Sequence, residues 1–204
     1  MVRAKRAPYM GRRHPLDGVF MSHYRRPGVG GAIYFFTVVT YERQPSLTLP
    51  PMRQALRESL TLAAAKRPFE TIAMVLLPDH LHCLWQLPEG DADFGTRWRL
   101  IKARATRAVA ALGLGLADGS PSRARRREHT VWQRRFWEHL IRDDDDFRRH
   151  ADYIHYNPVK HGYVRQPREW PYSTFAKFVR RGWYGPNWGA AEPENIVGWE
   201  AAGE

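Results

Sequence analysis

The sequence predicts an α+β fold in which helices cover a single antiparallel sheet of four strands. Three observations lead to this prediction. Segments rich in β-branched and aromatic residues alternate with helical segments in the order strand, helix, strand, strand, helix, strand. The helical segments repeat apolar residues every three or four positions. A chain of 204 residues, 43% of them hydrophobic, can bury one sizeable core. This order is the ferredoxin-like β-α-β-β-α-β arrangement, and an added C-terminal helix follows the last strand.

A basic segment precedes the first strand, and we expect it to be a flexible N-terminal arm. Residues 1–30 contain seven basic residues, one acidic residue, several prolines and glycines, and no apolar periodicity. This composition fits a segment that contacts phosphates and equally fits a solvated tail. Either Met1 or Met21 could begin the protein.

The first strand and the first helix come next. Gly31–Tyr41 is β-branched or aromatic on both faces, as expected for a central strand that is covered on both sides. Residues 52–65 carry apolar side chains at helical spacing, and Pro51 suits the first turn of that helix.

The turn Pro78–His82 joins two apolar runs, Thr71–Leu77 and Leu81–Leu87, into a hairpin. Because side chains alternate along a strand, the second run has two different faces. The polar face carries His80, His82, Leu84 and Gln86. The apolar face, which suits packing under helices, carries Leu81, Cys83, Trp85 and Leu87. Two ordinary, partly exposed histidines would give the same sequence pattern as a metal site. A third ligand is needed to distinguish the metal site from this alternative.

A second helix and a fourth strand complete the predicted sheet. Thr96 can cap a helix that runs to about Leu112. The basic residues that point away from its apolar stripe include Arg97, Lys102 and Arg104. They could contact phosphates or could simply be solvated. We expect a mobile, Arg-rich loop over residues 113–128 and the fourth strand over Val131–Ile141.

The added helix begins at the acidic run Asp143–Asp146. We expect Asp143 to be its N-cap, because negative charge is favoured at a helix N-terminus. A metal-binding cluster of carboxylates is the alternative for this run. The helix should end near Asn157, because Pro158 disfavours helical geometry in the residue before it.

Tyr153 and Asn157 lie four residues apart on one face of this helix, beside a core-facing stripe of Phe147, Ala151 and Ile154. If the helix packs across the open face of the sheet, Asn157 can join His80 and His82 as a third metal ligand. Tyr153 would then lie beside the ion.

A tyrosine beside a cation suggests chemistry at a phosphate. A phenol with a pKa of about 10 is a weak nucleophile at neutral pH, so it needs alignment with the phosphorus and a cation that neutralises developing charge. Tyr153 is the candidate nucleophile. Tyr156 is its rival, and His150, one turn earlier, is a candidate proton shuttle.

The composition indicates the partner and the compartment. Thirty-two basic and 21 acidic residues give a net charge of +11, which favours a polyanion such as nucleic acid. A single cysteine, Cys83, cannot form an intrachain disulfide, so a cytoplasmic protein is the simplest interpretation. No apolar run approaches the roughly 18 residues of a membrane span, and no signal-type segment follows the N-terminus. We expect residues 181–204, rich in Trp and Gly, to form a poorly ordered tail.

Six motifs occur in order along the chain: Tyr24–Arg26, Tyr34–Thr40, His80–His82, Thr96–Lys102, Gln133–His139 and Tyr153–Lys160. Together they resemble the HUH single-strand endonucleases, and specifically the REP-associated branch of the single-tyrosine transposases. The resemblance runs from about Tyr24 to Phe178, so we expect residues 31–180 to form one catalytic domain.

The resemblance implies an enzyme in which His80 and His82 bind Mg²⁺ or Mn²⁺ with the help of Asn157. Tyr153 would attack a DNA phosphate, leaving a 5′-phosphotyrosine link and a free 3′-hydroxyl. Imidazole ligands alone would favour a softer metal such as Zn, Fe or Ni, and Mn²⁺ is a compromise between the two expectations.

The implied partner is single-stranded and hairpin DNA from extragenic palindromic repeats, bound by a monomer or weak dimer with no contact to a membrane. The basic residues expected to contact DNA are Arg25, Arg26, Arg97, Lys102, Arg104 and Lys160. Two other functions stay open: a hairpin-binding protein that does not cleave, and a metallonuclease that uses water instead of a tyrosine. The active site could form within one chain or between two.

Overall fold

The computed structural model describes residues 30–112 and 131–199. Most of the expected N-terminal arm, with Arg25 and Arg26, lies outside the described residues. The loop expected over residues 113–128 and the end of the expected tail, residues 200–204, lie outside them as well.

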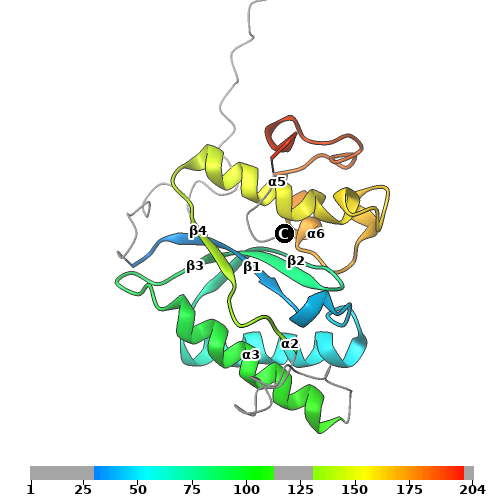
Figure 1. Cartoon of the computed structure of the whole chain (residues 1–204). Helices are drawn as coiled ribbons and strands as arrows, with labels where there is room; N and C mark the ends of the chain where they lie inside the picture. The colour runs from blue at the N-terminus through cyan, green and yellow to red at the C-terminus, as the bar shows by residue number, and fades with distance from the viewer. Residues whose placement is uncertain (1–29, 113–130, 200–204) are drawn as a thin grey trace, which may run out of the picture.

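Four strands form one sheet in the order β2-β3-β1-β4, and every neighbouring pair is antiparallel (Figure 1). The strands are β1 (Ile33–Val39), β2 (Glu70–Leu76), β3 (His80–Gln86) and β4 (Trp137–Leu140). All but the first residue of β1 are buried, as expected for a central strand. The predicted α+β fold with a four-stranded antiparallel sheet is therefore confirmed.

Helices cover both faces of this sheet (Figure 1). On one face lie α2 (Pro50–Lys66) and α3 (Phe94–Ala111), and on the other lie α5 (Asp144–Lys160) and α6 (Phe175–Arg180). Short 3₁₀ turns occupy the connections, namely η1 (Tyr41–Arg43), η2 (Pro167–Glu169) and η3 (Glu194–Ile196). Across residues 30–112 and 131–199, every helix is too short or too polar to traverse a lipid bilayer.

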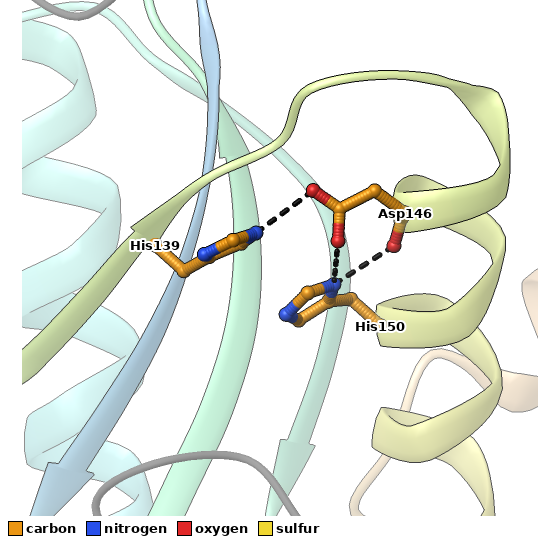
Figure 2. Close-up of side chains that lie close together, drawn as sticks. All are labelled: His139, Asp146 and His150. Atoms are coloured by element: carbon orange, nitrogen blue, oxygen red, sulfur yellow. Dashed lines mark hydrogen bonds and ion pairs between the residues drawn. The ribbon is translucent and has the colours of Figure 1, made fainter. Parts of the chain in front are cut away.

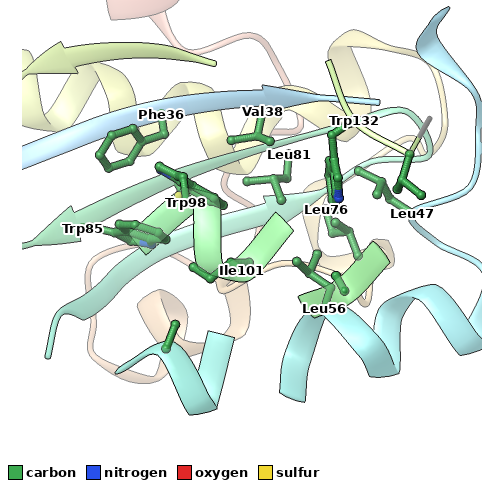
Figure 3. Close-up of a cluster of buried hydrophobic side chains, with 14 of the residues drawn as sticks. Phe36, Val38, Leu47, Leu56, Leu76, Leu81, Trp85, Trp98, Ile101 and Trp132 are labelled. Carbon is green, nitrogen blue, oxygen red and sulfur yellow. The ribbon is translucent and has the colours of Figure 1, made fainter. Parts of the chain in front are cut away.

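The core between the sheet and helices α2 and α3 contains the apolar face of β3, as the alternation of side chains along the strand predicted (Figure 3). Trp85 of β3 stacks on Trp98 of α3 with ring centroids 4.2 Å apart and planes inclined by 14°. Burial of a large apolar side chain contributes about 1.5–3 kcal/mol. This stacked pair therefore holds α3 against the sheet.

A second core lies between the sheet and α5. It combines Phe35 and Leu84 from the sheet with the predicted core-facing stripe of α5, which consists of Phe147, Ala151 and Ile154. The polar face of β3 is thus covered by the helix that carries Tyr153.

Two element boundaries differ from the prediction for local reasons. Helix α3 begins at Phe94, because the Asp93 carboxylate caps it by accepting from the backbone N–H of Thr96 at 3.0 Å. Thr96 therefore lies inside the helix. Strand β4 is shorter than expected, because the segment before it pairs only through the isolated bridge of Trp132 with Thr40.

Helix α5 begins as predicted, with the Asp143 carboxylate accepting from the backbone N–H of Asp146 at 2.8 Å. Its predicted end near Asn157 is wrong, because the helix continues through Pro158 to Lys160. Backbone N–H groups beyond the proline close the last turn, among them that of His161, which donates to the Asn157 carbonyl at 3.0 Å. The bias that proline imposes on its predecessor is outweighed here by these bonds.

Residues 181–199, which we expected to be poorly ordered, pack against α5. The Tyr184 hydroxyl donates to one oxygen of Asp152 at 2.9 Å, and the Asn195 amide donates to the other at 2.8 Å. Tyr184 and Ile196 are both buried in the second core. The described part of the tail therefore belongs to the packed domain.

Arg97 is buried completely beneath the start of α3. Its guanidinium donates to both carboxylate oxygens of Asp91, at 3.0 and 2.7 Å, and to the backbone carbonyls of Arg67, Pro68 and Asp93. These acceptors lie either in the segment just before β2 or in the segment just before α3. The Arg97 side chain therefore links these two segments.

Replacement of Arg97 by Met should lower the free energy of unfolding by about 3 kcal/mol, because five hydrogen-bond acceptors lose their donor. Urea denaturation measures this change. Arg99→Met alters an exposed arginine on the same helix and serves as the matched control. Equal stability of the two variants would contradict the assigned role.

His155 predicts a pH dependence of stability. Complete burial lowers its pKa in the folded chain to about 3, whereas an unfolded histidine has a pKa of about 6.5. Below pH 6.5 the unfolded chain therefore binds a proton that the folded chain excludes. The stabilisation is fully present above pH 6.5 and should fall by about 1.4 kcal/mol per pH unit as the pH drops towards 3.

Urea denaturation between pH 7 and pH 4 measures this slope. His155→Gln keeps a hydrogen-bonding side chain and removes the titration, so its slope should be smaller by about one proton. An unchanged slope in this variant would refute the assignment to His155.

Candidate active site

The turn before β3 is fixed by the neighbouring strand and loop. Thr40 donates to the Asp79 carbonyl twice, from its backbone N–H and from its hydroxyl, at 2.8 Å each. The backbone N–H of Leu47 donates to the Pro78 carbonyl at 2.8 Å. This turn therefore places His80 at the first position of β3 with little freedom.

Asp79 orients the imidazole of His80, with its Oδ1 2.7 Å from the Nδ1 atom of the ring. Burial alone would raise the pKa of Asp79, but bonds from His80 and Arg43 outweigh it and lower that pKa to about 2. The ionised carboxylate can only accept, so the Nδ1 atom of His80 carries the proton. When the ring is neutral, its lone pair is then on Nε2, which is the arrangement found in metal-ligating histidines.

His82 lies one position further along the same face, and its ring centroid is 4.9 Å from that of His80. Its Nδ1 is 3.0 Å from the Thr37 hydroxyl, and its ring stacks on Phe35 at 5.4 Å. Both imidazoles are buried. A polar contact at Nδ1 thus fixes the orientation of each ring of the predicted histidine pair.

Helix α5 brings Tyr153 to this pair. The Tyr153 ring meets the His82 ring edge-on, with centroids 5.3 Å apart. The Lys160 ammonium donates to the Tyr153 hydroxyl at 3.3 Å and lies 4.9 Å from the centre of the ring. A cation in this position stabilises negative charge on the phenol oxygen.

The tail covers Tyr153 from the other side. The Trp199 ring meets the Tyr153 ring edge-on at 4.9 Å, and only 1% of Tyr153 is exposed. A phosphate can therefore reach this hydroxyl only after a neighbouring side chain has moved.

Asn157 is completely buried one helical turn beyond Tyr153, on the same helix. Tyr156, the rival nucleophile, packs instead towards Gly189, where its ring lies within van der Waals reach of an added Cβ. Burial raises the pKa of the Tyr156 phenol. The structure thus brings Tyr153 next to the histidines and directs Tyr156 elsewhere.

The residues expected to contact DNA occupy different environments. Arg97 is buried and fully bonded within the protein, so we leave it out of any DNA-binding surface. Lys102 donates to the backbone carbonyl of Gln133 at 2.5 Å, and Arg104 is exposed on the same helix. Lys160 lies beside Tyr153 in the candidate site.

Lys102 also lines a groove of about 620 Å³ between α3 and the segment before β4. Its other basic lining residues are Arg99, Arg107 and Arg134. Helix α3 supplies much of the lining of this groove, whereas Tyr153 belongs to α5. These two helices cover opposite faces of the sheet (Figure 1).

A cluster that the sequence did not reveal joins β4 to α5 (Figure 2). The Asp146 carboxylate contacts the Nε2 atom of His139 at 2.8 Å and the Nδ1 atom of His150 at 3.1 Å. Burial alone would raise the pKa of Asp146, but bonds from His150 and His139 outweigh it and lower that pKa far below its usual value. The acidic run Asp143–Asp146 and the i, i+4 spacing of Asp146 and His150 were the only signals, and the position of His139 could not be foreseen.

No family model matches the chain. It is 46% identical over 168 residues to a REP-associated tyrosine transposase of Escherichia coli K12, covering 82% of this chain and 91% of the relative. A Haemophilus influenzae protein provisionally assigned to the same class is 43% identical over 178 residues, covering 87% and 99%.

Among solved structures, the chain is similar to a REP-associated tyrosine transposase bound to a REP hairpin. The TM-score is 0.67 at 44% sequence identity, and the match covers 85% of this chain and 94% of that structure.

Proposed function

We propose that this chain, which belongs to the family of REP-associated tyrosine transposases, is a metal-dependent single-stranded DNA endonuclease and strand transferase that acts on hairpin DNA. The observation that carries the proposal is the edge-on contact of Tyr153 with His82, because it joins a nucleophile to a potential metal ligand. The strand order and pairing support assignment of the sheet and its first two helices to the ferredoxin-like arrangement.

In the proposed reaction the Tyr153 oxygen attacks the phosphorus of a DNA phosphodiester. The bond from phosphorus to the 3′ oxygen breaks, the DNA stays attached as a 5′-phosphotyrosine, and the 3′ oxygen leaves as a hydroxyl. The proton lost by the phenol and the one gained by the 3′ oxygen are exchanged with solvent. Lys160 would stabilise the phenolate before attack, since its ammonium already contacts the hydroxyl. Attack by a 3′-hydroxyl on the phosphotyrosine reverses the step and joins strands.

We propose that His80, His82 and Asn157 hold a divalent cation, Mg²⁺ or Mn²⁺. Support comes from the donor set: Asp79 fixes the proton of His80 on Nδ1, and Asn157 is buried on the helix that faces both histidines. When bound, such a cation would neutralise charge on the phosphoryl oxygens. Two imidazoles favour Mn²⁺ over Mg²⁺.

Hairpin DNA is the proposed substrate because the solved relative is described as bound to a REP hairpin. A net charge of +11 supports binding of a polyanion. The groove with Lys102, and the exposed Arg104 on the same helix, would supply phosphate contacts on the α3 side. Tyr153 and His82 meet within one chain here, so we propose a monomer or weak dimer with the site built in cis. Because the proposed substrate is DNA, we also propose a cytoplasmic location.

A row of rings leads away from the histidines and would guide the unpaired flank of the hairpin. His161 lies 5.2 Å from His80, Tyr163 lies 6.0 Å from His161, and Trp170 stacks on Tyr163 at 5.4 Å. Tyr163 is 43% exposed. Aromatic rings in such a row stack on unpaired bases regardless of sequence. This row is the specific observation that favours a single-stranded segment next to the catalytic site.

Tyr153→Phe should abolish the covalent protein–DNA adduct, because the variant lacks the attacking oxygen and keeps the ring. A labelled hairpin with a single-stranded flank, incubated with Mn²⁺ and run on a denaturing gel, measures adduct and cleavage. Tyr156→Phe is the matched control and should retain both. Cleavage that survives Tyr153→Phe would indicate the water-using nuclease, and binding without cleavage by the native protein would indicate a non-cleaving hairpin-binding protein.

Tyr163→Ala should weaken binding of a flanked hairpin about tenfold, since one base–aromatic stack contributes about 1–3 kcal/mol. Tyr163→Phe preserves the ring and should bind like the native protein. Fluorescence anisotropy with flanked and blunt hairpins measures the effect. An equal loss of affinity for both hairpins would contradict a role in holding the unpaired flank.

A further inference from the structure

We propose that His139, Asp146 and His150 form a second cation site, separate from the His80 and His82 pair and suited to a Zn²⁺-like ion. The three side chains come from β4 and from the first turns of α5 (Figure 2). Each offers one ligand atom, and the three ligand atoms lie within 4.8 Å of one another. That spacing is close enough for one ion to bind all three after small side-chain movements.

The two imidazoles converge on one carboxylate. The Nε2 atom of His139 lies 2.8 Å from one oxygen of Asp146, and the Nδ1 atom of His150 lies 3.1 Å from the other. The two rings are also nearly parallel, with centroids 4.6 Å apart. An ion that takes the place of the two ring protons would therefore meet two nitrogens and one carboxylate oxygen, and its binding would release protons.

The surroundings of His150 allow this change. His150 is 2% exposed, and its Nε2 atom has no hydrogen-bond partner among residues 30–112 and 131–199. Movement of the ring therefore breaks no bond at Nε2, whereas its Nδ1 atom would exchange a contact with the Asp146 backbone carbonyl, at 2.8 Å, for the ion. Asp146 is held independently, because one of its oxygens accepts from the backbone N–H of Arg142 at 3.0 Å. Within the cluster, the Asp146 carboxylate is thus held in place and the His150 ring can adjust.

An open pocket of about 410 Å³ adjoins the cluster, and all three side chains line it. It has room for the water molecules that complete the coordination of an ion with three protein ligands. Two imidazoles with one carboxylate are a donor set of Zn²⁺ and of other first-row transition metals, whereas Mg²⁺ and Ca²⁺ prefer oxygen ligands.

This site is separate from the one proposed around His80. The ring of Phe35 lies between the two groups, 4.7 Å from the His150 ring and 5.4 Å from the His82 ring. An ion here would link β4 to α5 one turn before Tyr153. The ion would therefore hold α5 on the sheet. Its binding requires neither DNA nor DNA cleavage.

The test is calorimetric titration of the metal-stripped full chain with Zn²⁺. Native protein should bind one equivalent more than His139→Gln or Asp146→Asn. Asp145→Asn is the matched control, because this acidic residue lines the same pocket and does not belong to the cluster. It should bind like the native protein. His82→Ala should keep the equivalent assigned to this site, which separates it from the catalytic one. Equal stoichiometry in native protein and both cluster variants would overturn the proposal.

Circular dichroism shows whether each variant folds. If the cluster variants do not, crystals of the native protein soaked in Zn²⁺ decide the question. An anomalous difference peak between His139, Asp146 and His150 supports the site. Zinc peaks only at other positions would overturn it.

Discussion

The packing of α5 across the polar face of β3 is the constraint on which the rest of the structure depends. The helix brings Tyr153 to within 5.3 Å of the His82 ring, and neither residue forms a site alone. Its apolar stripe fills the second core, while α2 and α3 occupy the opposite face of the sheet. The sheet therefore has an apolar core on each face, and the face under α5 also carries the candidate site.

Polar contacts along its length set the position of α5. Near its start, Asp146 contacts His139 on β4 at 2.8 Å. In its middle, Asp152 accepts from Tyr184 of the tail, and the His155 ring reaches Thr174 at 2.9 Å. Buried polar contacts of this kind are directional, so they fix the rotation of a helix that apolar packing alone would leave adjustable. The described tail is thus part of what positions Tyr153.

Much of this arrangement could be predicted from the sequence because it depends on local periodicity. Strand alternation placed His80 and His82 on one face and Trp85 on the other, and helical spacing placed Tyr153 beside the core-facing stripe of α5. Neighbours in these patterns are fixed by backbone geometry within a few residues. The order of strands and helices followed from the same signals.

The features that were missed depend on segments that are distant in sequence. Helical periodicity places Arg97 on the polar side of α3. In the folded chain, its side chain is buried and donates to the backbone carbonyls of Arg67 and Pro68. His139 meets Asp146 only because β4 ends beside the first turn of α5. The docking of residues 181–199 likewise rests on bonds between distant segments. The course of α5 through Pro158 is different, because local bonds of the last turn outweigh the bias of the proline.

In the proposed reaction Tyr153, docked on its own sheet beside His82, is the group that becomes attached to DNA. Mass spectrometry of the trapped protein–DNA adduct, after digestion with trypsin and nuclease, identifies the attached residue. We expect a phosphonucleotide on Tyr153 and on no other tyrosine. A phosphonucleotide on Tyr156, or DNA that is cut without any modified tyrosine, would contradict it.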